Sequence, residues 1–176
     1  MKLLVVYSSQ TGNTKKVAEA IARAVPGSVI HPVEEAPPAA AAKDFDLVAA
    51  GYWVDKGMPD AKCRAWLETL EGCRIALFGT LGAWPDSDHA KECQAKAAAL
   101  VTNPERGNTV CGSWLCQGRI DPKVIEAMQK MAPNVHPMTP ERKARIKEAA
   151  KHPDVKDLAA AQEFILRTAR EAGFDV

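Results

Sequence analysis

Apolar and polar residues along the chain follow a pattern of short strands alternating with helices. Runs rich in Val, Ile, Leu and Ala are typical of strands that are buried on both faces of a parallel sheet. Between these runs, apolar residues recur at spacings of three and four, which indicates one buried face on each helix. The pattern predicts five strands, at residues 2–7, 28–33, 46–51, 74–78 and 109–115.

The helices are predicted from the same periodicity together with their first and last residues. Asp121-Pro122 and Thr139-Pro140 each combine a capping residue with a proline, which is a common start of a helix. Pro26-Gly27 ends the first apolar stripe, and Asp60 caps a further helix. Four more helices are expected at about 87–101, 121–131, 139–151 and 154–172.

Five strands separated by helices predict an α/β fold with a doubly wound parallel sheet. Right-handed crossovers make 2-1-3-4-5 the natural strand order, with a topological switch point between strands one and three. A chain of 176 residues is long enough for one domain with a substantial core, so residues 1–176 are expected to form a single domain.

The turn after the first strand carries the clearest chemistry in the chain. Residues 8–14 are small or hydroxylic, with Gly12 where the backbone can adopt a positive φ or approach a ligand. A helix N-terminus offers unpaired N–H groups and partial positive charge, so it favours anions. The four hydroxyls of Ser8, Ser9, Thr11 and Thr14, without a carboxylate, suit a phosphate dianion. The alternative is that Thr11 or Asn13 only caps the helix.

Other phosphate-binding loops fit these residues less well. A nucleoside triphosphate loop ends in Gly-Lys-Ser/Thr, whereas Gly12 is followed by Asn13-Thr14. The dinucleotide fingerprint needs three spaced glycines, and this turn has one. Response regulators need acidic residues after the first strand, and low-molecular-weight phosphatases need an Arg six residues after a Cys, where Cys111 is followed by Gln117. These classes are therefore excluded.

Residues 5–14, VVYSSQTGNT, resemble the loop with which the flavodoxin family binds the phosphate of flavin mononucleotide (FMN) without a metal. The resemblance implies that Trp53 and Trp84, in the loops after strands three and four, stack on the isoalloxazine ring, although plain packing is the alternative. It also implies a peptide at Gly57 that reorients toward the reduced flavin. The implied cofactor residues are Ser9, Gln10, Thr11, Gly12, Asn13, Thr14, Tyr52, Trp53, Gly57, Thr80, Leu81, Gly82, Ala83 and Trp84. For Trp114, packing is the favoured interpretation.

Residues 117–153 form a longer segment than a minimal flavodoxin needs between its fifth strand and last helix. This helical insertion is expected to be a partner surface, a lid or an oligomer contact. Together with residues 51–57, 78–83 and 136–142, the chain resembles a subgroup of flavodoxin-like proteins from anaerobic bacteria. A flavodoxin-like accessory protein of bilirubin reductase is similar in kind.

Charge, cysteine usage and hydropathy narrow the function classes further. The net charge of +1 indicates neither nucleic-acid binding nor a polybasic membrane patch. Five cysteines without a Cys-x-x-Cys pair indicate neither a disulfide framework nor a zinc site, although a redox-active thiol stays open at Cys116, expected in a cofactor loop. No apolar run is long enough for a signal or membrane segment, which predicts a cytoplasmic protein.

No spacing predicts a metal site, a nucleophile–base pair or a catalytic carboxylate pair. His89 could approach a flavin or substrate, whereas His31, His136 and His152 beside prolines are interpreted as structural. The resemblance therefore implies an FMN-binding electron carrier between a reductase and an acceptor enzyme. Two alternatives stay open: an FMN-dependent NAD(P)H or quinone oxidoreductase or reductase accessory subunit, and a flavin-free binding subunit.

Overall fold

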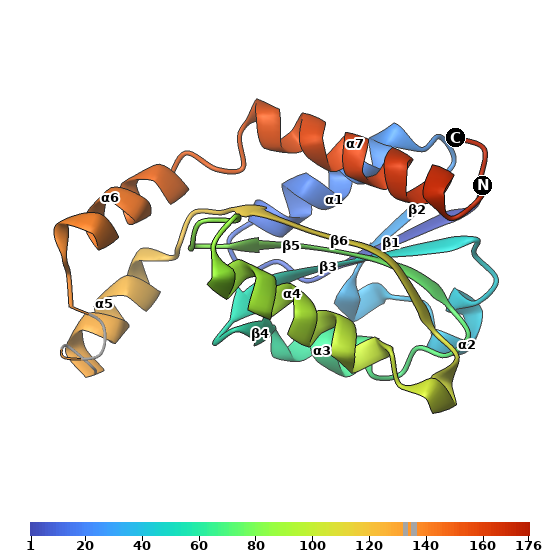
Figure 1. The fold of residues 1–176 in the computed structure, drawn as a ribbon, viewed down its shortest axis with the longest axis horizontal. Helices are drawn as coiled ribbons and strands as arrows, with labels where there is room; N and C mark the ends of the chain where they lie inside the picture. Colours follow the sequence, from blue (N-terminus) through green and yellow to red (C-terminus); the bar gives the residue numbers. More distant parts are fainter. Residues whose placement is uncertain (132–133, 135–136) are drawn as a thin grey trace.

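The computed structural model describes residues 1–131, 134 and 137–176; His136, expected to be structural, lies outside them. Its parallel sheet has the order β2-β1-β3-β5-β6, which confirms the predicted topology, and a short additional strand, β4, pairs with β3 in antiparallel fashion. The strands are β1 (Leu3–Tyr7), β2 (Val29–Pro32), β3 (Leu47–Asp55), β4 (Met58–Pro59), β5 (Arg74–Leu81) and β6 (Thr109–Gln117) (Figure 1).

Helices cover both faces of the sheet, as the buried strands require. Leu77 and Phe78 are neighbours on β5 and point to opposite faces, where they belong to two separate apolar clusters. The Phe78 cluster packs under α1 (Asn13–Ala24) and α7 (Val155–Glu171). The Leu77 cluster packs under α2 (Ala39–Ala42), α3 (Ala61–Leu67) and α4 (Asp88–Val101) (Figure 1). Two 3₁₀ turns, at Val33–Glu35 and Pro104–Arg106, complete the connections.

Strand β3 runs four residues further than predicted and turns into a hairpin. Lys56 has φ 51° and Gly57 φ 80°, the positive values that a two-residue hairpin turn between β3 and β4 needs. Tyr52 and Trp53 are therefore strand residues rather than loop residues. Strand β5 also continues through Gly79, where a Cβ atom would lie 2.8 Å from the Tyr52 carbonyl oxygen. The predicted end of this strand at residue 78, which would place Thr80 and Leu81 in the loop that follows, was therefore wrong.

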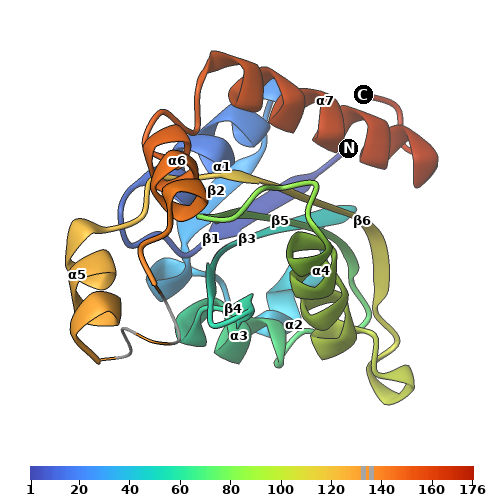
Figure 2. The same ribbon diagram turned by 60° about the vertical axis from the view of Figure 1, so that its left-hand side comes forward.

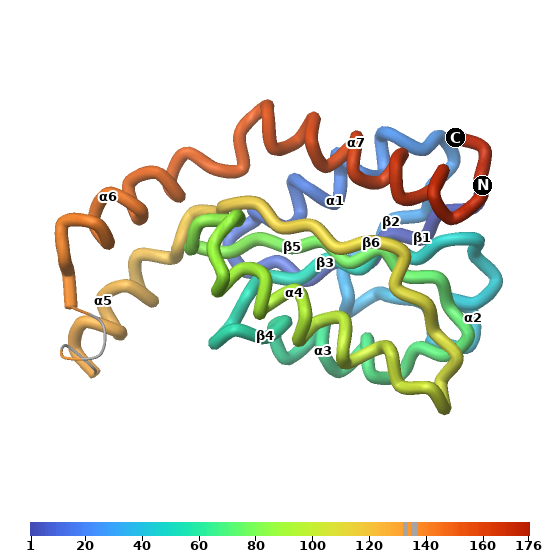
Figure 3. The backbone as a smooth tube through the Cα atoms, viewed as in Figure 1, coloured from blue at the N-terminus to red at the C-terminus, as the bar shows by residue number. Residues whose placement is uncertain are grey.

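The arm, as we call residues 119–131, 134 and 137–153, carries α5 (Pro122–Met131) and α6 (Pro140–Ala149). The arm extends from the carboxyl edge of the sheet, away from the two helical layers (Figures 1 and 2). Its two ends lie together, because the Arg119 N–H donates to the His152 carbonyl oxygen at 3.2 Å. The backbone tube shows the chain leaving β6 into the arm and returning from it directly into α7 (Figure 3). The helical character expected of the insertion is thus observed.

Candidate functional site

The predicted phosphate loop lies at the topological switch point of the sheet. Strand β1 pairs with β2 on one side and with β3 on the other, and the loop follows its last residue, Tyr7. Ligands of doubly wound folds bind at this position, outside the carboxyl ends of the strands. The site is therefore built from the first turn of α1 and the ends of β3, β5 and β6.

Helix α1 begins at a glycine, which has no side chain to cap it. Its N-cap residue is Gly12, with φ 85°, and neither Thr11 nor Asn13 caps it. Ser9 Oγ accepts from the third N–H group of the helix, that of Lys15, at 3.3 Å, and the first turn holds no acidic residue. A Cβ atom on Gly12 would meet nothing within 4 Å, so the glycine serves the backbone conformation. The partial positive charge of the helix end is therefore left for an anion.

The side chains of the loop divide into an exposed and a buried group. Ser9, Gln10 and Thr11 lie at or near the surface, and the Ser9 Oγ accepts from the Lys15 N–H at 3.3 Å. Asn13 and Thr14 are buried. Thr14 Oγ1 lies 3.0 Å from Thr80 Oγ1, which fixes the first turn of α1 to β5. Ser9 and Thr11 are consequently the loop hydroxyls placed to meet a ligand.

Asn13 connects the loop to the arm, a contact that the sequence did not indicate. Its Nδ2 donates to Thr11 Oγ1 and to the Arg119 carbonyl oxygen, both at 2.9 Å. Gly118 lies directly over it, since a Cβ atom there would be 2.8 Å from Asn13 Nδ2. The segment after β6 thus covers the start of α1, and Asn13 positions the loop and the arm relative to each other.

Asp60, predicted only as a helix cap, also holds the end of β1. It is 2% exposed, and its Oδ1 accepts from Ser8 Oγ at 2.8 Å as well as from the first N–H groups of α3. Its Oδ2 is buried and has no partner among the described residues. Ser8 is therefore bonded within the protein, which removes one of the four hydroxyls counted toward a phosphate.

The end of β3 leaves one aromatic side chain partly exposed and buries the other. Tyr52 is fully buried, which raises the pKa of its phenol, and its hydroxyl has no partner within the described chain. Only its backbone is left for a cofactor. Trp53 points to the other face and is partly exposed. Gly57, at the hairpin tip, lies over α4. A Cβ atom at this position would be 3.8 Å from His89 Cε1.

The end of β5 leads to the most exposed tryptophan of the site. Trp84 is 45% exposed, and its carbonyl oxygen accepts from the Ser87 N–H at 3.2 Å and from Ser87 Oγ at 2.6 Å. Thr80 and Leu81 are buried in β5, while Gly82 and Ala83 are partly exposed. The Ile120 side chain packs on Gly82. An exposed indole held on an ordered turn suits stacking against a flat ring.

Two further residues behave as structural ones. Trp114 stacks on Phe164 of α7, with ring centroids 6.1 Å apart, which confirms packing as its role. Cys116 lies buried in β6 rather than in a cofactor loop, and burial raises the pKa of its thiol. A protonated, buried thiol is a poor nucleophile, so the structure gives no support to redox chemistry there.

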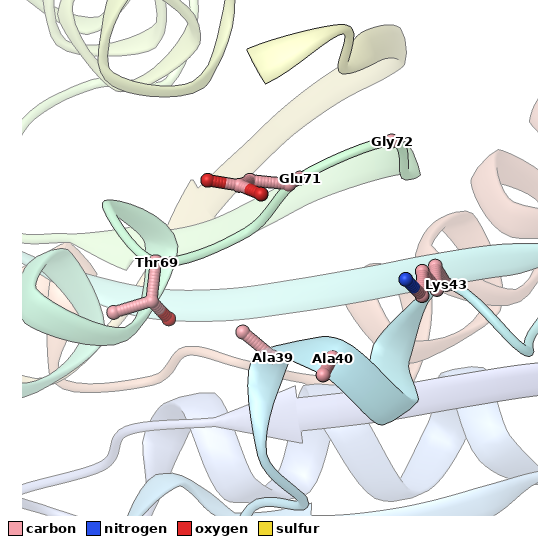
Figure 4. Close-up of a pocket in the computed structure, with 6 residues that line it drawn as sticks. All are labelled: Ala39, Ala40, Lys43, Thr69, Glu71 and Gly72. Carbon is pink, nitrogen blue, oxygen red and sulfur yellow. The ribbon is translucent and has the colours of Figure 1, made fainter.

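Two other parts of the protein have features of a binding site. His152, Asp154 and Asp157 bring possible metal-ligand atoms within 4.8 Å of one another, but they form the capping box and an ion pair at the start of α7. A pocket lies between α2 and the segment before β5 (Figure 4). Its residues precede β3 and β5, so it lies at the amino ends of the strands, whereas the phosphate loop follows the carboxyl end of β1. The residues that line the pocket are mostly exposed: Ala39, Ala40, Lys43, Thr69, Glu71 and Gly72.

The residues at the carboxyl edge fit the predicted FMN. The helix start at Gly12 and the surface hydroxyls of Ser9 and Thr11 suit its phosphate, and Trp53 and Trp84 offer flat surfaces near the same edge. A sequence model described as a flavodoxin domain matches residues 4–166. The chain belongs to the flavodoxin family.

Individual relatives and solved structures agree with this membership. The chain is 32% identical to the flavodoxin-like domain-containing protein BilS of Clostridioides difficile (strain CD3), over 93% of this chain and 94% of that protein. Oxidised Flavodoxin 1 from Bacillus cereus has the same fold, with a TM-score of 0.57 and 16% identity over 97% of this chain and 98% of its own. A flavoprotein from Lactobacillus acidophilus NCFM in complex with FMN matches with a TM-score of 0.50 and 20% identity, over 65% and 92% of the two chains. None of the described helices is long and apolar enough to cross a membrane.

Proposed function

We propose that this protein binds FMN and transfers electrons between a reductase and an acceptor redox enzyme. The observation that carries the proposal is the start of α1, where the N-cap Gly12 has no side chain to cap the helix, surface hydroxyls lie beside it and the first turn holds no acidic residue. Family membership supports FMN as the ligand, and the FMN complex of the Lactobacillus flavoprotein supports the same cofactor class.

The chain's own residues would bind and orient the cofactor. The N–H groups that begin α1, with Ser9 and Thr11, would hold the phosphate, and Trp53 and Trp84 would contact the ring. Bound FMN supplies one- and two-electron chemistry, for which the protein contributes binding, orientation and access. Because Trp84 is exposed, a ring that stacks on it stays within reach of another protein. A cytoplasmic location, expected from the sequence, stays a prediction.

A visible absorption spectrum and the mass of the released cofactor test FMN binding. A colourless protein that also fails to bind added FMN would overturn the proposal. Electron transfer from NAD(P)H only after a reductase is added supports a carrier, whereas rapid turnover by the isolated protein would assign it as an oxidoreductase instead.

The variant Thr11→Asp tests the phosphate loop itself. An aspartate oxygen can still accept from Asn13 Nδ2, but its charge would oppose the phosphate, so we expect FMN affinity to fall roughly 100-fold or more. Thr109→Asp, an equal change at the exposed start of β6, is the control and should leave the affinity unchanged. Equal affinities of all three proteins would contradict the assigned loop.

A further inference from the structure

The arm, whose base contacts the phosphate loop, exposes apolar side chains on α5. Met131 is 86% exposed and Met128 38%, and no residue of α5 is buried. Val124 and Ile125, on the same helix, are only partly covered. Clusters of this kind mark contact surfaces more often than isolated apolar residues do, and methionine is common in surfaces that adapt to a partner.

The arm also carries the positive charge of the molecule. Residues 119–153 hold eight Lys or Arg and four Asp or Glu, so with a chain total of +1 the remainder of the protein has a net charge of −3. The basic residues concentrate on α6, at Arg142, Lys143, Arg145 and Lys147. The molecule is therefore polarised, with a basic arm on a mildly acidic remainder. We call this remainder, residues 1–118 and 154–176, the body.

Two of these cations, Arg142 and Arg145, form no ion pair with an acidic residue of the described chain, and Arg142 contacts α5. Arg142 Nη2 lies 3.5 Å from Met128 Sδ, so the α6 cation and the α5 methionine form one surface. The Nε atoms of Arg142 and Arg145 are buried and have no partner among the described residues. Burial and the nearby Arg142 charge lower the pKa of Arg145. A group of cations without a neutralising carboxylate favours contact with a negatively charged surface.

We propose that the arm is the docking surface for an acidic face of a redox partner protein. The inference rests on the proposed electron-transfer function and names the chemistry of the partner. The bond from Asn13 Nδ2 to the Arg119 carbonyl oxygen places the base of the arm on the phosphate loop. A protein docked on the arm therefore lies at the edge where Trp84 is exposed. Charge steers such an encounter and sets the orientation, and the methionines add a small apolar contact.

Other occupants of the arm are less favoured by its composition. A two-fold dimer through the arm would place two surfaces of net charge +4 against each other. Helices that lie in a membrane interface usually bury Trp or Phe, and residues 119–153 contain no aromatic Trp, Tyr or Phe. An acidic protein surface would complement the positive charge of the arm and does not require aromatic side chains.

The test compares charge reversal on the arm with equal reversal on the body. Lys143→Glu/Lys147→Glu changes two exposed residues of α6, and the control Arg23→Glu/Arg167→Glu changes two exposed residues of α1 and α7. The acidic probe is a dithionite-reduced plant-type [2Fe–2S] ferredoxin, mixed with the FMN-loaded protein in a stopped-flow instrument. Each cluster gives one electron, so two ferredoxins and two protons convert one FMN to its two-electron reduced form and both clusters are reoxidised.

We expect the arm variant to lower the second-order rate with ferredoxin about tenfold at low salt, and the control to change it less than about twofold. The rate of the unaltered protein should fall as salt is added, and that of the arm variant should depend less on salt. With cytochrome c as a basic probe, which takes one electron per haem from the reduced protein, the arm variant should be faster. Met131→Gln should slow the ferredoxin reaction without changing its salt dependence.

Several results would overturn the proposal. If the two double variants changed the rate with ferredoxin equally, or not at all, the arm would not be the docking surface. A dimer in sedimentation velocity that Lys143→Glu/Lys147→Glu dissociates would assign the surface to a second copy. Binding to phosphatidylserine vesicles that the same variant abolishes would assign it to a membrane. If the protein binds no FMN, the proposed function fails, and calorimetric titration of ferredoxin into the cofactor-free protein then decides the docking by itself.

Discussion

The phosphate loop and the arm meet at the same edge of the sheet, but the protein holds them in different ways. The loop is fixed by buried polar pairs, Thr14 with Thr80 and Ser8 with Asp60, and by the core beneath it. The arm is held at its base by the hydrogen bond between Arg119 and His152, and its α5 buries no residue. Segments with few buried apolar contacts have low local stability. The body therefore holds the phosphate loop in one geometry, whereas the arm has a surface that is available for contact.

The largest expected difference between the two regions is the cost of removing a core side chain. Leu77→Ala empties a fully buried position on β5, so the free energy of unfolding should fall by about 2–5 kcal/mol. Ile146→Ala on α6, at a partly exposed position, should cost less than about 1.5 kcal/mol. Urea unfolding measures both. Equal losses would show that the arm is as strongly packed as the body.

A smaller effect is expected at the bond that connects the two regions. Asn13→Ala removes the donor to Thr11 Oγ1 and the Arg119 carbonyl oxygen, and should lower the free energy of unfolding by about 1–2 kcal/mol. Hydrogen exchange of the α5 and α6 amides should also speed up, because the base of the arm loses its anchor.

Asn108→Ala is the matched control for this change. Asn108 also bonds backbone groups through its amide, to the carbonyl oxygens of Leu70 and Val101 and from the Cys73 N–H, far from the arm. It should lower stability without altering exchange in α5 or α6. Faster exchange of the arm in both variants would mean that Asn13 has no special connection to it.

These contacts also show how far the sequence could be interpreted. Strand order followed from the apolar runs, because strands buried on both faces of a parallel sheet lack alternation. The first helix and the exposed Trp84 were found from local patterns. The Asn13–Arg119 bond joins residues 106 positions apart, and the Ser8–Asp60 bond joins residues 52 apart. Such pairs leave no local periodicity, so sequence reasoning could not find them.

The errors at the ends of the strands have a related cause. Tyr52 and Trp53 favour strands, but the preceding Gly51 indicates a strand end and so predicts that they are loop aromatics. Gly51 and Gly79 lie inside strands, where the Phe78 ring and the Tyr52 backbone leave no room for a side chain. A glycine in an apolar run can therefore mark close packing as well as a strand end.

A modest pH effect is expected where the arm joins α7. The hydrogen bond from His152 Nδ1 to Asp157 raises the pKa of His152, with smaller contributions from Glu148 and Asp154. The stabilisation is full below the unfolded pKa of about 6.5 and is lost as the pH rises through the higher folded value. For a partly exposed pair we expect less than about 1 kcal/mol. The free energies of unfolding at pH 5.5 and pH 9 should therefore differ less in His152→Asn than in the unaltered protein. His31→Asn is the control.

The smallest expected effect on stability is at the tip of α5, and it separates stability from function most directly. Met131→Gln alters a side chain that is 86% exposed, so the free energy of unfolding should stay within about 0.5 kcal/mol of the original value. The proposed docking reaction should nevertheless slow, because the apolar contact with the partner is lost. A loss of stability in urea unfolding would show that Met131 packs within the protein in solution, and the arm would then resemble the body. Unchanged stability with a slower reaction would show that this side chain serves contact with another protein.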